Sequence, residues 1–144
     1  MLTLVPTPIG NLEDITLRAL RVLREADLIA CEDTRTSGIL LKHYDINKPL
    51  TSFHLHNENS KSEYLLEKLR NGENIAVISD AGTPGISDPG WILLKHAVNE
   101  NLDVDVLPGP SALLPALLIS GINPQPFLFF GFPPEKSGER KKLF

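Results

Sequence analysis

Short apolar runs alternate along the chain with segments whose apolar residues recur at helical spacing. The runs predict strands at Leu2–Val5, Leu28–Cys31, Leu50–Phe53, Ile75–Ile78, Leu102–Leu107 and Phe127–Phe130. The helical spacing predicts helices at Ile15–Ala26, Ser37–His43, Ser60–Leu69, Trp91–Val98 and Ala112–Ile119. Alternating strands and helices are typical of an α/β fold with a mostly parallel sheet and helices on both faces, because parallel neighbours need crossover connections.

Local signals refine these elements. Asp14 is placed to cap the first helix, and Ser60 with Glu63 matches a capping box for the third. The uninterrupted run Ile75–Ile78 predicts a central strand, whereas the alternation within Leu102–Leu107 predicts a strand with a wet face or near an edge. The aromatic side chains expected in the core are Trp91, Phe127, Phe129 and Phe130. An alternative position for Phe129, and for Phe132, is the lining of a crevice or a partner surface.

The loops that follow four of the strands contain the unusual sequences. In an open parallel sheet, ligands bind beyond the carboxyl ends of the strands. The loops after Val5, Cys31, Ile78 and Leu107 are therefore expected to meet at one crevice.

The loop Ser79–Gly90 holds three glycines and two prolines directly after the predicted central strand. Glycines let the backbone approach a ligand closely, and Asp80 or Asp88 is placed to receive ribose hydroxyls or a cation. For Asp88 alone, capping of the next helix is the favoured interpretation. The loop Pro108–Ala112 admits two interpretations, a rigid turn or a seat for a flat ring against a helix start.

Polar side chains also follow the strand Leu28–Cys31. Glu32, Asp33 and Arg35 are able to orient a substrate and accept a proton, or to form a local ion pair, and the sequence leaves both interpretations open. Cys31 is expected to be a buried core thiol. His54 and His56 lack a third ligand, so no metal site is predicted.

Composition narrows the functional classes. The chain has 144 residues, 42% of them hydrophobic, and a net charge of -4, which argues against nucleic-acid binding by this chain on its own. A single cysteine suits a reducing compartment, so a cytoplasmic location is expected. The first loop has too few glycines for an ATP or dinucleotide fingerprint, and no membrane span or signal peptide is indicated.

Five motifs together resemble one known family. They are VPTPIGNLEDIT from Val5, CEDTR from Cys31, SDAGTPGISDPG from Ser79, PGPSA from Pro108 and FFGFPP from Phe129. In this order they resemble the tetrapyrrole-methylase superfamily, and within it the ribosomal RNA 2′-O-ribose cytidine methyltransferases. Small-molecule members carry a glycine-rich first loop and a GDP motif, whereas this chain has Pro8-Ile9-Gly10 and Gly82-Thr83-Pro84.

The resemblance implies S-adenosylmethionine as cofactor, bound in a cleft between two domains, and usually a homodimer. Residues 1–131 would form the N-terminal domain and residues 132–144 a linker to a second domain, so this chain alone is expected to be inactive. The implied cofactor contacts are Pro8, Ile9, Gly10, Asp80, Ala81, Gly82, Thr83, Ile86, Ser111 and Ala112. The hypothesis for catalysis is that Glu32 or Asp33 assists deprotonation while Arg35 steers RNA phosphate.

The implied partner is 16S ribosomal RNA, within the small ribosomal subunit, and the resemblance implies neither DNA nor a membrane. Two alternatives stay open. One is a tetrapyrrole or other small-molecule methylase that shares the cleft; the other is a non-catalytic dimerisation module.

Overall fold

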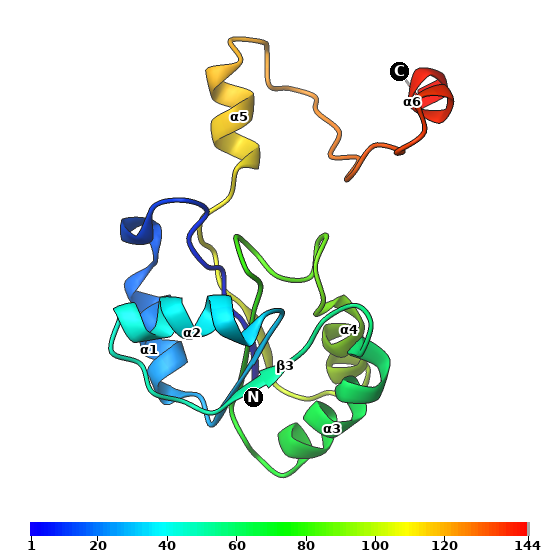
Figure 1. Cartoon of the computed structure of the whole chain (residues 1–144). Coiled ribbons are helices and arrows are strands. Elements are labelled where there is room, and N and C mark those ends of the chain that lie inside the picture. Colours follow the sequence, from blue (N-terminus) through cyan, green and yellow to red (C-terminus); the bar gives the residue numbers. More distant parts are fainter. Residues whose placement is uncertain (144) are drawn as a thin grey trace. The chain divides into compact units, whose positions relative to one another are not determined.

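The computed structural model describes residues 1–143, in which the chain forms two compact units, Met1–Ala112 and a second that begins at Leu113. Figure 1 follows the chain through its elements. The first unit is built on a sheet whose described strands all run parallel, in the order β3-β2-β4-β1-β5. Their bounds are β1 Leu2–Leu4, β2 Leu28–Cys31, β3 Leu50–Ser52, β4 Ile75–Ile78 and β5 Val104–Val106.

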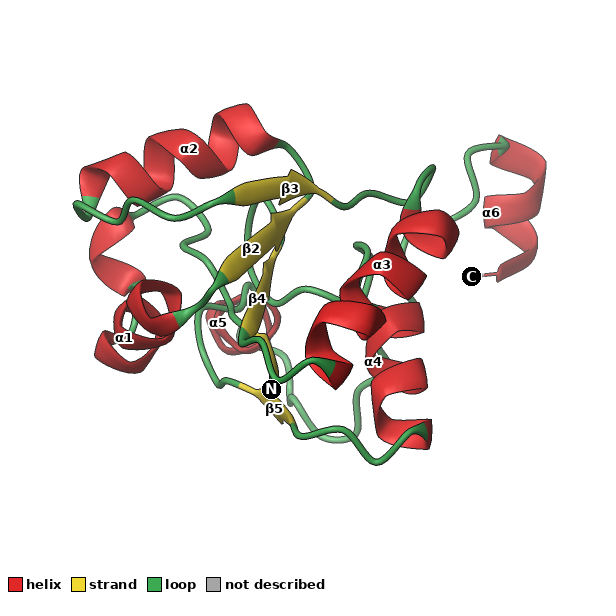
Figure 2. Cartoon of the chain, turned by 90° about the horizontal axis from the view of Figure 1, so that it is seen from below, coloured by secondary structure: helices red, strands yellow, loops and turns green. Residues whose placement is uncertain are grey.

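Helices cover both faces of this sheet. The first unit contains the 3-10 helix η1 Leu12–Asp14 and the α-helices α1 Leu17–Glu25, α2 Thr34–His43, α3 Glu58–Arg70 and α4 Trp91–Asn99. Figure 2 shows α1 and α2 on one side of the strands and α3 and α4 on the other. Side chains of β4 alternate between two apolar clusters, with Ile75 and Val77 in one and Ala76 and Ile78 in the other. The predicted α/β fold with helices on both faces is confirmed.

Two predictions about the sheet hold. The run Ile75–Ile78 forms the central strand β4, whose four residues are all buried. The alternating segment forms the edge strand β5, where Val106 is 45% exposed. The hydrophobic pattern therefore distinguished the central strand from the edge strand correctly, because a strand covered on both faces carries apolar residues at every position.

Three helix caps differ from the predicted ones. Asp14 lies in η1, and Thr16 caps α1 instead, its Oγ1 accepting from the backbone N–H of Ala19 at 3.0 Å. Helix α3 begins before Ser60, whose hydroxyl donates back to the Asn57 carbonyl. Asp88 caps nothing, since the cap of α4 is Gly90.

The expectation of a strand at Phe127–Phe130 was wrong, as was the expectation of a core for its phenylalanines. These residues lie outside strands, and Phe127, Phe129 and Phe130 are about half exposed. An apolar run forms a strand only when another strand receives its backbone hydrogen bonds, and the described part of the second unit contains none. The prediction that Trp91 lies in the core was also wrong, because Trp91 is the first residue of α4 and is 59% exposed.

The second unit contains α5 Leu113–Ile119 and α6 Ser137–Leu143. Helix α6 lies within the segment predicted to be a linker, and its last turn holds Arg140, Lys141 and Lys142, which suit the negative end of the helix dipole. None of the helices in residues 1–143 is long and apolar enough to cross a membrane.

Candidate functional site

The loops after β1 and β4 are joined to each other. The backbone N–H of Thr7 donates to the Gly82 carbonyl at 2.9 Å, and the N–H of Gly82 donates to the Thr7 carbonyl at 3.1 Å. The Thr7 hydroxyl donates to the carbonyl of buried Ser79 at 3.1 Å. Gly82 has a φ of +81°, a conformation that L side chains rarely adopt, so glycine permits this pairing.

The other two loops reach the same edge of the sheet. Gly109, after β5, packs so closely on Pro6 that a Cβ atom added to it would lie 2.6 Å from the Pro6 Cβ. The loop after β2 is joined to the loop after β4, because the backbone N–H of Asp33 donates to the Asp80 carboxylate at 3.3 Å. The expectation that the four loops meet at one place is therefore confirmed.

A buried carboxylate outside the predicted site residues fixes the far end of the Ser79–Gly90 loop. Glu58, in the first turn of α3, is 6% exposed, and its Oε1 accepts from the backbone N–H of Gly90 at 2.9 Å. Gly90 is the cap residue of α4 and has no side chain to satisfy this end of the helix. Glu58 therefore holds the loop to the start of α4.

We expect Glu58→Gln to lower the free energy of unfolding by about 1 kcal/mol, because a neutral amide replaces a charge-assisted acceptor. Hydrogen exchange of the Gly90 amide should become faster, as measured by NMR. Glu67→Gln on the exposed side of the same helix is the control and should leave that amide unchanged. Equal exchange in both variants would show that Glu58 does not hold the loop.

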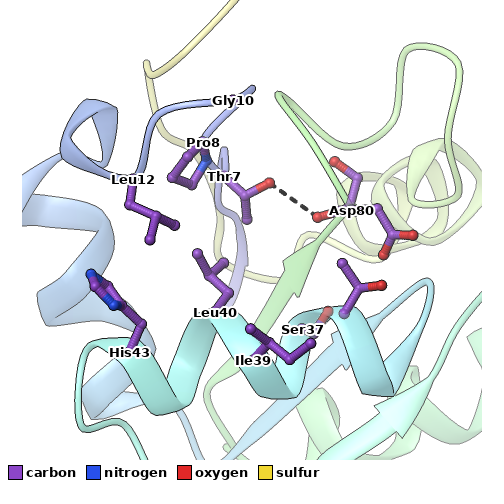
Figure 3. Close-up of a pocket in the computed structure, with 11 residues that line it drawn as sticks. Thr7, Pro8, Gly10, Leu12, Ser37, Ile39, Leu40, His43 and Asp80 are labelled. Carbon is purple, nitrogen blue, oxygen red and sulfur yellow. Dashed lines mark hydrogen bonds between the residues drawn. The ribbon is translucent and has the colours of Figure 1, made fainter.

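A cavity of about 290 Å³ opens between the loop after β1 and helix α2; we call it the α2 cavity. Figure 3 shows Pro8 and Leu12 facing Leu40 across it, with His43 towards one end and Asp80 towards the other. The Tyr44 hydroxyl donates to the Leu12 carbonyl and so ties the loop to the end of α2. The lining consists of Thr7, Pro8, Gly10, Leu12, Thr36, Ser37, Ile39, Leu40, His43, Ser79 and Asp80.

The cavity includes part of the predicted cofactor set. Pro8, Gly10 and Asp80 line it, and the remaining members lie outside it, in the loops after β1, β4 and β5. Those remaining members are Ile9, Ala81, Gly82, Thr83, Ile86, Ser111 and Ala112. The prediction overlooked the face of α2, although the spacing of Thr36, Leu40 and His43 places them on one side of a helix.

Asp33 and Arg35 form the local ion pair that the sequence left open. Asp33 caps α2, and its carboxylate accepts from the Arg35 backbone N–H at 2.8 Å and from the guanidinium at 2.7 Å and 3.1 Å. These hydrogen bonds lower the pKa of Asp33 to about 2. A carboxylate held so firmly as an anion is a weak proton acceptor.

Arg35→Ala should raise the pKa of Asp33 towards its ordinary value of 3.8, because the guanidinium bonds are the largest cause of the shift. Carboxyl carbon chemical shifts followed by NMR between roughly pH 1 and pH 6 would measure it, in the range where Asp titrates. Arg21→Ala, which removes an ion pair with Glu25 on α1, is the control and should leave Asp33 unchanged. An Asp33 pKa that stays near 2 in the Arg35 variant would contradict the assignment.

Glu32 has the opposite electrostatic environment. Its pKa is raised, first by burial and then by the negative charges of Asp80 and Asp88, while a backbone hydrogen bond from Asp80 acts in the other direction. A carboxylate whose charge is disfavoured accepts a proton readily. Glu32 is therefore the better proton acceptor of the two predicted acids. It lies beside Asp80, and Asp80 lines the α2 cavity.

Cys31 is buried and free, as predicted, and burial raises the pKa of its thiol. A protonated buried thiol is a poor nucleophile. Across residues 1–143, no three His, Cys, Asp or Glu side chains are grouped so as to hold a metal ion.

Known proteins with similar sequences match almost the whole chain. Ribosomal RNA small subunit methyltransferase I of Mycoplasmopsis pulmonis is 54% identical over 96% of this chain and 62% of its own length. The protein of the same name from Haemophilus influenzae is 54% identical over 98% of this chain and 50% of its own. That from Thermotoga maritima is 49% identical over 99% and 64%. The chain thus spans about half to two thirds of these relatives.

Solved structures with low sequence identity share the fold. Uroporphyrin-III-C-methyltransferase from Thermus thermophilus superposes with a TM-score of 0.63 at 23% identity, over 81% of this chain and 51% of that one. Diphthine synthase gives a TM-score of 0.69 at 16% identity, over 85% and 49%. The model of the tetrapyrrole (corrin/porphyrin) methylases matches residues 1–142. The converging loops and these matches together show that the chain belongs to the tetrapyrrole (corrin/porphyrin) methylase family.

Proposed function

We propose that this chain is the N-terminal part of an S-adenosylmethionine-dependent enzyme that methylates a cytidine ribose 2′-hydroxyl in 16S ribosomal RNA. The observation that carries the proposal is the identity of 49% to 54% with proteins named as ribosomal RNA small subunit methyltransferases, which extends over 96% to 99% of the chain. The matched regions are 138 to 142 residues long, so they extend over the loops that meet at the site as well as over the sheet.

The residues of the loop after β4 suit a cofactor of this kind. Gly82 and Gly85 have φ of +81° and +92°, a backbone conformation that L side chains rarely adopt, so these glycines allow the course that the loop takes past the ends of the strands. Asp80, Ala81 and Ile86 are exposed, as are Ser111 and Ala112 in the loop after β5. We propose that these five hold the cofactor, and the carboxylates of Asp80 and Glu32 would favour its positive sulfonium group.

Bound S-adenosylmethionine would supply an electrophilic methyl group. Glu32 would receive the proton of the 2′-hydroxyl as the oxygen bonds to the methyl carbon. The bond between that carbon and the sulfonium sulfur would break, its electron pair would stay on sulfur, and the neutral thioether S-adenosylhomocysteine would leave. Asp33 would hold Arg35 instead of accepting the proton. The Arg35 side chain is 89% exposed and would meet an RNA phosphate.

The proposal includes a homodimer that works in the cytoplasm on the small ribosomal subunit. The net charge of -4 makes tight phosphate binding by this chain alone unfavourable. The remaining length of the relatives, or the folded ribosomal particle, would supply the rest of the RNA contact.

Calorimetric titration of S-adenosylmethionine tests the cofactor assignment. The titration compares the 144-residue chain with the gene product at its full natural length. We expect tight binding to the full-length protein and weak binding to the 144-residue chain. Absence of binding to both would remove the methyltransferase proposal. Methyl transfer to a tetrapyrrole precursor, with none to ribosomal RNA, would favour the small-molecule alternative.

A further inference from the structure

The α2 cavity has a buried polar group at its base that is only weakly satisfied in the free protein. Ser37 on α2 is 2% exposed and lines the cavity, and the polar group that interacts with its Oγ within residues 1–143 is the buried Cys31 thiol, a weak hydrogen-bond partner. A buried hydroxyl with a thiol as its partner is poorly satisfied, and such a group in a native structure calls for an explanation. A ligand that fills the cavity and bonds to Ser37 would provide one.

The walls of the cavity suit a flat ring. Pro8 and Leu12 lie on the side of the first loop, and Leu40 lies across from them on α2 (Figure 3). Exposed Ile39, at 74%, extends the apolar wall of α2. Enzymes that act on a nucleotide turned out of its stack bind its base between apolar or aromatic side chains and bond to its polar edge. Ser37 and His43 are placed for such an edge.

Size and position separate this cavity from the proposed cofactor site. Its volume of about 290 Å³ is at the lower limit for pockets that enclose drug-sized ligands, and suits one ring better than the whole of S-adenosylmethionine. Of the loop Asp80–Ile86, only Asp80 lines it, and Ser111 and Ala112 do not. The cavity therefore shares Asp80, and Pro8 and Gly10 of the implied cofactor set, with the cofactor site, and it extends beyond that site along α2.

We propose that the α2 cavity binds the pyrimidine base of the target nucleotide, turned out of the RNA, with the Ser37 hydroxyl bonded to the edge of the base. This inference rests on the proposed function and adds to it the subsite that selects the nucleotide. With the base between Leu12 and Leu40, the ribose lies towards the Asp80 end, beside Glu32. The base pocket and the proton acceptor would then act on one nucleotide.

Two substitutions in the full-length protein test the pocket. Ser37→Ala removes the hydroxyl, and Leu40→Phe fills part of the cavity. We expect each to lower kcat/KM for unmodified small ribosomal subunits at least about tenfold, with the dissociation constant for S-adenosylmethionine unchanged. Because the Cys31 thiol is a weak hydrogen-bond partner for this hydroxyl, the Tm of Ser37→Ala should change little. Leu17→Phe, at a position 86% exposed on α1, is the matched control and should behave as the unsubstituted protein.

Three other outcomes would overturn the inference, and they point to different causes. Unchanged methylation by both variants would show that the cavity holds no base, while the proposed function stands. Weaker binding of S-adenosylmethionine in parallel with the lost activity would assign the cavity to the cofactor. Absence of ribosomal RNA methylation by the unsubstituted protein would remove the proposed function itself, and the base pocket with it.

Discussion

Glu32→Gln should lower kcat for methyl transfer about 100-fold or more in the full-length protein, with little change in S-adenosylmethionine binding. Removal of a general base typically costs a factor of this order. Asp33→Asn is the matched comparison, because it changes the adjacent carboxylate in the same manner. Asp33 is paired with Arg35, and asparagine also caps helices well. The loss of kcat in Asp33→Asn should therefore be less than about tenfold.

The raised pKa of Glu32 also predicts how kcat and Tm depend on pH. In the unsubstituted protein, kcat should rise as Glu32 loses its proton above the ordinary value of 4.5. The folded protein binds a proton at Glu32 more tightly than the unfolded chain does. The contribution of Glu32 to stability is therefore complete at low pH and is lost as the pH rises through the raised pKa. Glu32→Gln should therefore raise the Tm slightly at neutral pH and leave it unchanged below about pH 4. If the Glu32→Gln variant had a higher kcat than the Asp33→Asn variant, the assignment of Glu32 as the base would be wrong.

Gly109→Ala should lower the free energy of unfolding by about 1 to 3 kcal/mol, the usual cost of forcing extra atoms into a packed site. The added Cβ atom would lie 2.6 Å and 2.9 Å from two ring atoms of Pro6, and neither the ring nor the backbone can move away easily. The loop after β5 would separate from the loop after β1. Urea denaturation followed by circular dichroism measures the change.

Gly38→Ala on α2 is the control for this substitution. A Cβ atom there meets nothing within 4 Å, and the position is inside a helix, where alanine is favoured by about 0.5 to 1 kcal/mol. It should therefore stabilise the protein while Gly109→Ala destabilises it. Equal effects of the two substitutions would show that the contact between Gly109 and Pro6 is not tight in solution.

Periodicity predicted the sheet well because its strands are buried on both faces. Ile75–Ile78 carries an apolar residue at every position, and each side chain enters one of two cores. The converging loops followed from the parallel topology alone. The prediction of a strand at Phe127–Phe130 failed because apolar character favours burial of a segment but does not indicate whether a partner strand exists.

The contacts that shape the site were harder to predict. Glu58 and Gly90 are 32 residues apart, and no local pattern indicates that one satisfies the other. The same holds for Tyr44 and Leu12, whose hydrogen bond joins the first loop to the end of α2. Sequence also left Glu32 and Asp33 equivalent. The fold separates them, because only Asp33 is in reach of the Arg35 guanidinium.

The most direct test of the proposed function is the identity of the methylated product. Small ribosomal subunits that lack the modification would be incubated with the full-length protein and S-adenosylmethionine labelled in its methyl group, and the RNA digested and analysed by mass spectrometry. We expect one labelled nucleoside, 2′-O-methylcytidine. A methyl group on a base, or no transfer to the RNA, would contradict the proposal.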